Sequence, residues 1–183
     1  MRDSELTKSA LRSFVRQLKA ENQGSFAAWS AEIAERVMQT SLWQSAGTVL
    51  LYHALPDEPD LQSVLDKGMM QGKQVLLPVV EGDDLVLRRY TGMDSLCEGA
   101  FHILEPNGED FPVSRYGEVG LVIVPGMAFD IDGHRLGRGR GYYDRLLPRL
   151  RCAYKLGVCF PFQLLDAIPY EPHDIKMDEV VRL

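Results

Sequence analysis

Short apolar runs alternate along the chain with segments of helical periodicity, and this alternation constrains the fold more than any other feature. Four runs are rich in valine, leucine and isoleucine and too short for typical helices: 48–53, 73–80, 120–125 and 154–160. Strands that are apolar on both faces are typical of parallel sheets covered by helices on each side. The pattern therefore predicts an α/β fold.

The intervening segments predict the remaining elements. Helices are predicted over 4–20, 25–39, 61–70, 142–150 and 162–167. Each prediction is based either on apolar residues at helical spacing or on the position of the segment between two predicted strands. Two further strands are predicted over 84–90 and 179–182. The segment 98–116 is rich in proline, glycine and asparagine, and we expect an irregular connection there.

The length of 183 residues suits one domain, and no repeat, low-complexity tract or linker divides the chain. We therefore expect residues 1–183 to form a single α/β domain. Its sheet should be mostly parallel and flanked by helices on both faces, as in a Rossmann-like, open three-layer sandwich.

Charge and composition exclude some classes of partner. The net charge is −6, from 26 acidic and 20 basic residues, which argues against binding nucleic acid or an anionic membrane over a broad surface. The sequence has no apolar signal-peptide core and no run long enough to span a membrane. The three cysteines show no metal-ligand spacing. We expect a cytoplasmic monomer with reduced thiols that acts on a small molecule.

The segment from Arg135 to Asp144 carries the residues best suited to chemistry. It lies between the clearest apolar strand and a predicted helix, where open α/β sheets bind ligands. Glycines alternate with arginines, so bare backbone N–H groups and guanidinium groups can both approach phosphate oxygens. These residues are Arg135, Gly137, Arg138, Gly139, Arg140 and Gly141. The alternative is a flexible surface loop with solvated arginines.

Familiar phosphate motifs do not describe this segment. Tyr142 stands where a dinucleotide fingerprint requires its third glycine and where a P-loop requires lysine. Asp144, in the first turn of the following helix, could stabilise that helix or bind a divalent cation. Lys8 and Arg12 lie one helical turn apart and could face one anion, although a solvated helix face explains them equally well.

A longer pattern around the segment resembles a known family signature. It reads Pro125-Gly126-x-Ala128-Phe129-Asp130, followed by Gly133-x-Arg135-Leu136-Gly137-x-Gly139-x-Gly141-Tyr142-Tyr143-Asp144-Arg145. Shorter matches are Lys8-x-x-Leu11-Arg12, Leu104-Glu105-Pro106 and His173-Asp174. Together they resemble the 5-formyltetrahydrofolate cyclo-ligase family, also called 5,10-methenyltetrahydrofolate synthetases, over nearly the whole chain.

The resemblance implies closure of 5-formyltetrahydrofolate to 5,10-methenyltetrahydrofolate with MgATP, releasing ADP and phosphate. Phosphorylation would turn the formyl oxygen into a leaving group, and N10 would attack the formyl carbon. This chemistry needs positioning and charge neutralisation rather than a protein nucleophile. The implied cofactors are ATP and Mg²⁺, and the implied partner is a reduced formyl folate, with or without a polyglutamate tail.

The resemblance also implies roles for individual residues. Catalysis falls to Arg138, for charge stabilisation, and to Tyr142. Nucleotide contacts are implied for Lys8, Arg12, Arg135, Gly137, Arg138, Gly139, Arg140, Gly141 and Tyr143. Substrate contacts are implied for His53, Glu58 and Tyr142, and magnesium ligation for Asp144 and Asp174.

Near Glu58 the chain departs from the family pattern. Leu61 stands where the family usually has threonine, and Pro59 is unusual. Asp57 therefore remains a competing carboxylate for the pterin ring of the folate.

Two other classes of function fit the same segment. A sugar-phosphate isomerase or acyl-transfer enzyme could hold a substrate phosphate with these arginines, without ATP. A binding protein could retain folate or nucleotide without turnover. The fold does not separate them, but Asp144 and Asp174 favour a metal–nucleotide site.

Overall fold

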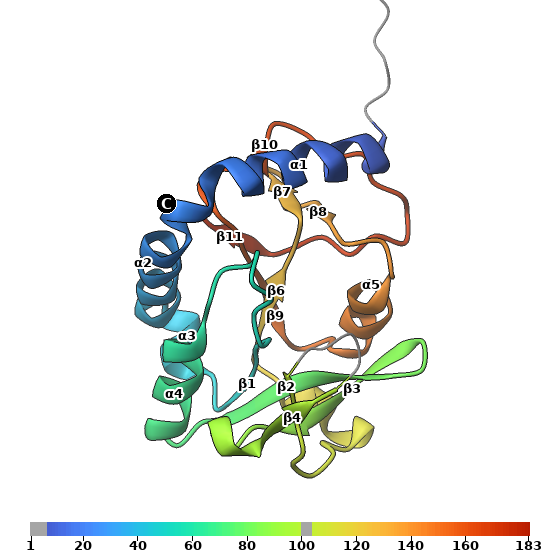
Figure 1. Ribbon diagram of the computed structural model, residues 1–183. Coiled ribbons are helices and arrows are strands. Elements are labelled where there is room, and N and C mark those ends of the chain that lie inside the picture. The colour runs from blue at the N-terminus through green and yellow to red at the C-terminus, as the bar shows by residue number, and fades with distance from the viewer. Residues whose placement is uncertain (1–6, 100–103) are drawn as a thin grey trace, which may run out of the picture.

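The computed structural model describes residues 7–99 and 104–183, and its centre is a six-stranded sheet of order β11-β9-β6-β1-β2-β3 (Figure 1). All neighbouring strands run parallel except β2 and β3. The strands are β1 (Thr48–Leu50), β2 (Gln74–Glu81), β3 (Asp84–Arg89), β6 (Leu121–Pro125), β9 (Tyr154–Val158) and β11 (Glu179–Val181).

Helices cover both faces of this sheet. On one face lie α2 (Phe26–Gln39), α3 (Ser41–Ser45) and α4 (Gln62–Met70), which pack with the fully buried Trp43 against Val49 of β1. The other face is covered by α5 (Tyr142–Leu146) and a 3₁₀ turn at Leu147–Arg149. Figure 1 shows the two groups on opposite sides of the strands. The predicted three-layer α/β architecture is therefore confirmed.

A small three-stranded sheet holds the segment that follows β6. Its order is β10-β7-β8, with β7 (Ala128–Asp130), β8 (Arg135–Leu136) and β10 (Leu164–Leu165). Helix α1 (Lys8–Asn22) packs across it through Leu11 and Val15, which share a core with Leu136. The N-terminal helix is thereby fixed beside the glycine- and arginine-rich segment.

Several predicted elements differ from the structure. The helix predicted over 162–167 is wrong: a 3₁₀ turn at Pro161–Gln163 leads into β10, because Leu164 and Leu165 pair with β7. The helix predicted over 142–150 is α-helical only to Leu146, and Pro148 lies in the 3₁₀ turn that follows.

The segment 98–116 is not wholly irregular. It contains β5 (Leu104–Pro106), which pairs with β4 (Leu96–Glu98), and the start of a 3₁₀ helix, Val113–Glu118. The strands predicted over 48–53 and 154–160 end early, at Leu50 and Val158.

The first helix begins at Lys8, capped by the Thr7 side chain. Residues 4–6 of the helix predicted over 4–20 lie outside the described residues. Among the residues that the structure describes, no helix is long and apolar enough to cross a membrane.

Candidate active site

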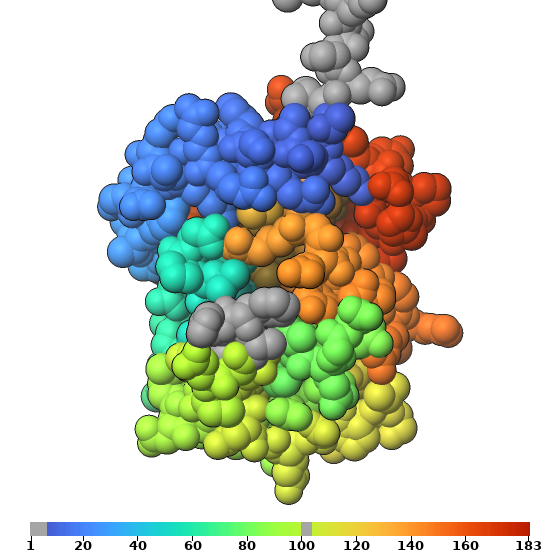
Figure 2. All heavy atoms as spheres, turned by 45° about the vertical axis from the view of Figure 1, so that its right-hand side comes forward, coloured from blue at the N-terminus to red at the C-terminus, as the bar shows by residue number. Residues whose placement is uncertain are grey.

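A pocket of about 400 Å³ lies between the segment that follows β1 and the segment from β8 to α5. Figure 2 shows the hollow on this face, between the teal residues after β1 and the orange residues before and within α5. Its volume suits a small organic ligand. The pocket adjoins the carboxyl ends of β1 and β6, which is where open α/β sheets bind ligands.

The pocket has an apolar part and a charged part. The apolar wall comes from β2, β3 and β5, and consists of Pro78, Val80, Leu85 and Leu104. The charged part contains three arginines and three carboxylates: Arg135, Arg138, Arg140, Glu58, Glu105 and Asp144. A ligand with a flat apolar portion and an anionic portion would match both parts.

Glycines shape the segment around the charged part. Gly139 and Gly141 have φ values of +103° and +70°, in the region that favours glycine. The carbonyl oxygen of Gly137 accepts a hydrogen bond of 2.8 Å from Arg12 Nε. This bond connects α1 directly to the segment.

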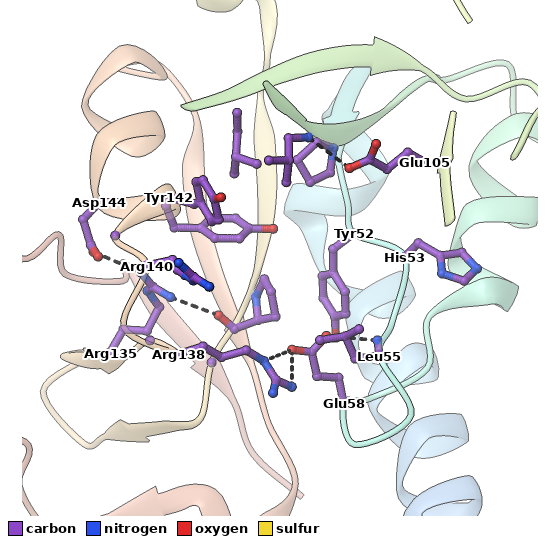
Figure 3. Close-up of a pocket in the computed structure, with 18 of the residues that line it drawn as sticks. Tyr52, His53, Leu55, Glu58, Glu105, Arg135, Arg138, Arg140, Tyr142 and Asp144 are labelled. Atoms are coloured by element: carbon purple, nitrogen blue, oxygen red, sulfur yellow. Dashed lines mark hydrogen bonds and ion pairs between the residues drawn. The ribbon is translucent and has the colours of Figure 1, made fainter. Parts of the chain in front are cut away.

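Arg138 reaches across the pocket to Glu58 (Figure 3) and also binds a second carboxylate, Asp57. Its Nε and Nη2 atoms lie 3.0 and 2.8 Å from Glu58 Oε1, and Nη2 lies 2.5 Å from Asp57 Oδ1. The other oxygen of Glu58 accepts from the Leu55 amide at 3.1 Å. The structure thus brings together two predicted site residues, Arg138 and Glu58, from opposite sides of the pocket.

Lys19 extends this charged cluster from α1. Its Nζ lies 2.9 Å from Asp57 Oδ2, and its side chain is only 5% exposed. Burial lowers the pKa of Lys19, although the hydrogen bond to Asp57 opposes the shift. The sequence pattern does not reveal this contact, because Lys19 and Asp57 are 38 residues apart in the chain.

Arg135 stabilises the glycine- and arginine-rich segment through contacts with Asp144 and Tyr143. Its Nη2 lies 3.0 Å from Asp144 Oδ1, and its guanidinium carbon lies 5.3 Å from the ring centre of Tyr143. Its Nε is buried without a hydrogen-bond partner among the described residues. An unsatisfied buried donor beside a pocket suits an anionic ligand.

The two predicted magnesium ligands each face a cation. Asp144 lines the pocket and pairs with Arg135, whereas Asp174 pairs with Lys8 Nζ at 2.5 Å and is not among the lining residues. Burial alone would raise the pKa of Asp174, but hydrogen bonds from Lys8 and from the Glu171 amide hold that pKa below its ordinary value.

Magnesium commonly takes one or two protein carboxylates and completes its shell with water and phosphate oxygens. The described residues contain no group of three or more histidine, cysteine, aspartate or glutamate side chains that could hold a metal.

Aromatic residues form much of the remaining lining. Tyr142 and Tyr143 both contact the pocket. Burial, reinforced by the charge of Glu58, raises the pKa of Tyr143, so its hydroxyl stays protonated. The Tyr52 hydroxyl donates to the Pro59 carbonyl at 2.8 Å. Burial lowers the pKa of His53, although Asp60 opposes the shift, which keeps the imidazole neutral near pH 7.

Glu105 has no role in the sequence analysis, although it belongs to the matched Leu104-Glu105-Pro106. It is buried in the pocket wall, and its Oε1 accepts from the Val80 amide at 3.0 Å. It lies on β5, which pairs with β4 in a separate sheet, and only the packing of this sheet beside β2 brings Glu105 to the pocket, so the sequence pattern alone did not single it out.

Known proteins of one family are similar to this chain in sequence. The sequence profile of the 5-formyltetrahydrofolate cyclo-ligase family matches residues 4–182. A 5-formyltetrahydrofolate cyclo-ligase of Mycolicibacterium smegmatis is 36% identical over 144 residues, covering 75% of this chain and 74% of the relative. The Escherichia coli K12 cyclo-ligase is 31% identical over 156 residues, covering 82% and 85% respectively.

A solved structure is also similar. The 5,10-methenyltetrahydrofolate synthetase of Aquifex aeolicus superposes with a TM-score of 0.83 at 33% identity, covering 96% of this chain and 89% of that one. The profile match extends over nearly every residue, and sequence and structure name the same activity. The chain therefore belongs to the 5-formyltetrahydrofolate cyclo-ligase family and is a ligase.

Proposed function

We propose that the protein closes 5-formyltetrahydrofolate to 5,10-methenyltetrahydrofolate in a reaction that consumes ATP, requires Mg²⁺ and releases ADP and phosphate. One observation supports this most: a single pocket joins an apolar wall to a glycine- and arginine-rich segment. The apolar wall suits a pterin ring. The arginines and bare backbone suit a triphosphate.

The substrate side of the proposal uses the residues after β1. Glu58 lines the pocket, whereas Asp57 is not among the lining residues. We therefore assign Glu58 rather than Asp57 to the pterin, where a carboxylate can accept from ring N–H groups. His53 is neutral and Tyr142 is partly exposed on the same cavity, so both can hydrogen-bond to the folate.

The nucleotide side uses the segment from Arg135 to Asp144. Gly137, Gly139 and Gly141 leave room beside Arg138 and Arg140, and Tyr143 supports the segment from within. Arg12 and Lys8 approach from α1, through Gly137 and Asp174. Asp144, with Asp174 as the second candidate, would hold Mg²⁺, which would neutralise phosphate charge.

The proposed reaction needs no protein nucleophile, and each bond that forms is matched by a bond that breaks. The formyl oxygen takes the γ-phosphoryl group as the bond between that group and ADP breaks. The N10 lone pair then forms a bond to the formyl carbon, N10 loses its proton, and the carbon–oxygen bond breaks with release of phosphate. Arg138 stabilises the charge on the transferring group, and the pocket holds N10 near the formyl carbon.

The direct test is an assay of purified protein with 5-formyltetrahydrofolate, ATP and magnesium chloride, followed by near-ultraviolet absorbance of the conjugated product. We expect a rise that needs all three additions and one ADP per product. An ATP-independent product would indicate the isomerase or acyl-transfer alternative. Folate and nucleotide binding without any absorbance change would indicate a binding protein. Either result contradicts the proposal.

A further inference from the structure

The nearly buried side chain of Lys19 carries a positive charge in the site, and the proposed reaction gives this residue no role. Lysine is rarely buried unless it is paired, because removing an ammonium group from water costs several kcal/mol. Its Nζ contacts Asp57 Oδ2 at 2.9 Å, and its side chain is 5% exposed. Its partner Asp57 is partly exposed and also contacts the predicted catalytic arginine, so the burial of Lys19 at this place requires an explanation.

Asp57 divides its two oxygens between two cations. Oδ2 binds Lys19, and Oδ1 binds Arg138 Nη2 at 2.5 Å. Burial lowers the pKa of Lys19 most, and the charge of Arg138 lowers it further, against the attraction of Asp57 and Glu58. The two cations therefore repel one another across a shared carboxylate.

The two cations differ in their freedom to move. The Arg138 side chain is 40% exposed and extends from a glycine-rich segment, whereas Lys19 is packed on α1. To reach a phosphate, Arg138 must leave Asp57 and Glu58. Glu58 would then have Oε1 free for the substrate, and Asp57 would keep Lys19.

We propose that Lys19 is a positioning residue that neutralises Asp57 and thereby allows Arg138 to turn from the two carboxylates towards the phosphates. This inference rests on the proposed function. Without Lys19, departure of Arg138 would leave Asp57 unpaired, and Arg138 would stay on the carboxylates. Removing the carboxylate at position 57 should have the opposite effect, because it releases Arg138.

Three variants separate this role from simple structural support. Lys19→Met keeps the aliphatic stem and removes the charge, Lys19→Arg keeps the charge, and Asp57→Asn removes the shared carboxylate. We expect Lys19→Met to lower kcat and to weaken MgATP binding, each roughly tenfold. Lys19→Arg should stay within about threefold of the unmodified protein. Asp57→Asn should bind MgATP severalfold more tightly, because it releases Arg138. The double variant Lys19→Met/Asp57→Asn should regain the kcat that Lys19→Met loses.

MgATP binding is measured by calorimetry without folate, kcat by product absorbance, and folding by the thermal midpoint. A purely structural role would lower the midpoint of Lys19→Met while leaving kcat and MgATP affinity unchanged, and would overturn the proposal. Equal losses in Lys19→Met and Asp57→Asn would also overturn it. If Lys19→Met does not fold, Lys19→Gln takes its place with the same expected contrast.

A failure of the proposed function can be distinguished from a failure of this inference, because the unmodified protein would then form no product. The MgATP affinities of the variants still decide the role of Lys19 in that case.

Discussion

At the scale of single residues, charged side chains of the site pair with one another. Arg138, the predicted catalytic residue, is bound to Asp57 and Glu58 rather than directed at open solvent. Arg135 is bound to Asp144 in the same way. Substrates therefore replace existing ion pairs when they bind, and the net gain depends on the stronger charge of a triphosphate.

Arg138→Ala tests this residue directly. We expect kcat to fall by about 10²–10³-fold, the range for removal of one charge-stabilising donor. Folate affinity should change much less, because Glu58 and the apolar wall remain. Absorbance kinetics and folate titration measure the two effects. Arg115→Ala is the matched control, since Arg115 pairs with Glu118 on the exposed surface. Turnover unchanged in folded Arg138→Ala would remove this residue from the mechanism.

At the scale of elements, α1 is tied to the rest of the site by side chains from its first two turns and from its last turn. Lys8 reaches Asp174 in the loop before β11, Arg12 reaches Gly137, and Lys19 reaches Asp57. One helix thus contacts three segments that are far apart in sequence. A stripe of positive residues along a helix predicts none of these partners individually.

The Lys8–Asp174 pair predicts a pH dependence of stability. The pKa of Asp174 is lowered below its ordinary value of 3.8 in the folded protein, so the pair stabilises the fold above that value and the stabilisation is lost as pH falls through the folded-state pKa. Without ligands, Asp174→Asn should lower the thermal midpoint at pH 7. The difference from the unmodified protein should shrink towards zero in strong acid.

Thermal unfolding from pH 7 to pH 3 measures this effect. The exposed Asp94 provides the control, because Asp94→Asn should shift the midpoint little at any pH. A difference for Asp174→Asn that grows as the pH falls would contradict the assignment.

Two glycines with nearly equal φ values, one of them before α5, allow a test in which the backbone strain caused by an alanine substitution is the same at both positions. Gly141 has φ +70°, and Gly72, remote from the pocket lining, has φ +71° with open space around its Cα. Alanine at either position should cost about 1 kcal/mol. Only Gly141→Ala should raise KM for ATP severalfold, since Gly141 lines the pocket and its added Cβ would displace the Arg145 side chain. Equal KM values with equal thermal midpoints would remove Gly141 from the nucleotide site.

The local sequence pattern predicted those elements whose structure does not depend on which other elements they pair with. The apolar run at β6 and the amphipathic α2 need only burial, so their positions follow from periodicity. Leu164 and Leu165 show the limit, because an apolar pair after Pro161 fits a helix until pairing with β7 decides for a strand. The main site segment was recognisable from Gly and Arg alternation. Glu105 and Lys19 were not, since strand pairing and α1 docking bring them in.

At the scale of the whole molecule, the pocket is formed by residues that lie far apart in the sequence. Its lining begins at Tyr52 and ends at Asp144, and its sides come from β2, β3, β5 and α5. No part of the chain forms it alone, so ligands should bind the native state and not the unfolded one.

Saturating ligands should therefore stabilise the entire fold. At a hundredfold excess over Kd, binding contributes about 2.7 kcal/mol, which corresponds to roughly 5–10 °C for a domain of this size. Thermal unfolding with and without MgATP measures the shift. Arg138→Ala should show a smaller shift with MgATP and a similar one with folate. A shift that is equal in both proteins with MgATP would place the nucleotide elsewhere.

The position of β1 in the sheet has a consequence for synthesis on the ribosome. β1 lies between β2, which follows it closely in sequence, and β6, which does not. As the chain emerges, β1 can pair early with β2 on one side, while its other edge remains open until residues 121–125 have been made. An apolar strand with an open edge favours association with other chains. The nascent protein is therefore most in need of chaperone protection in the interval between synthesis of β2 and synthesis of β6.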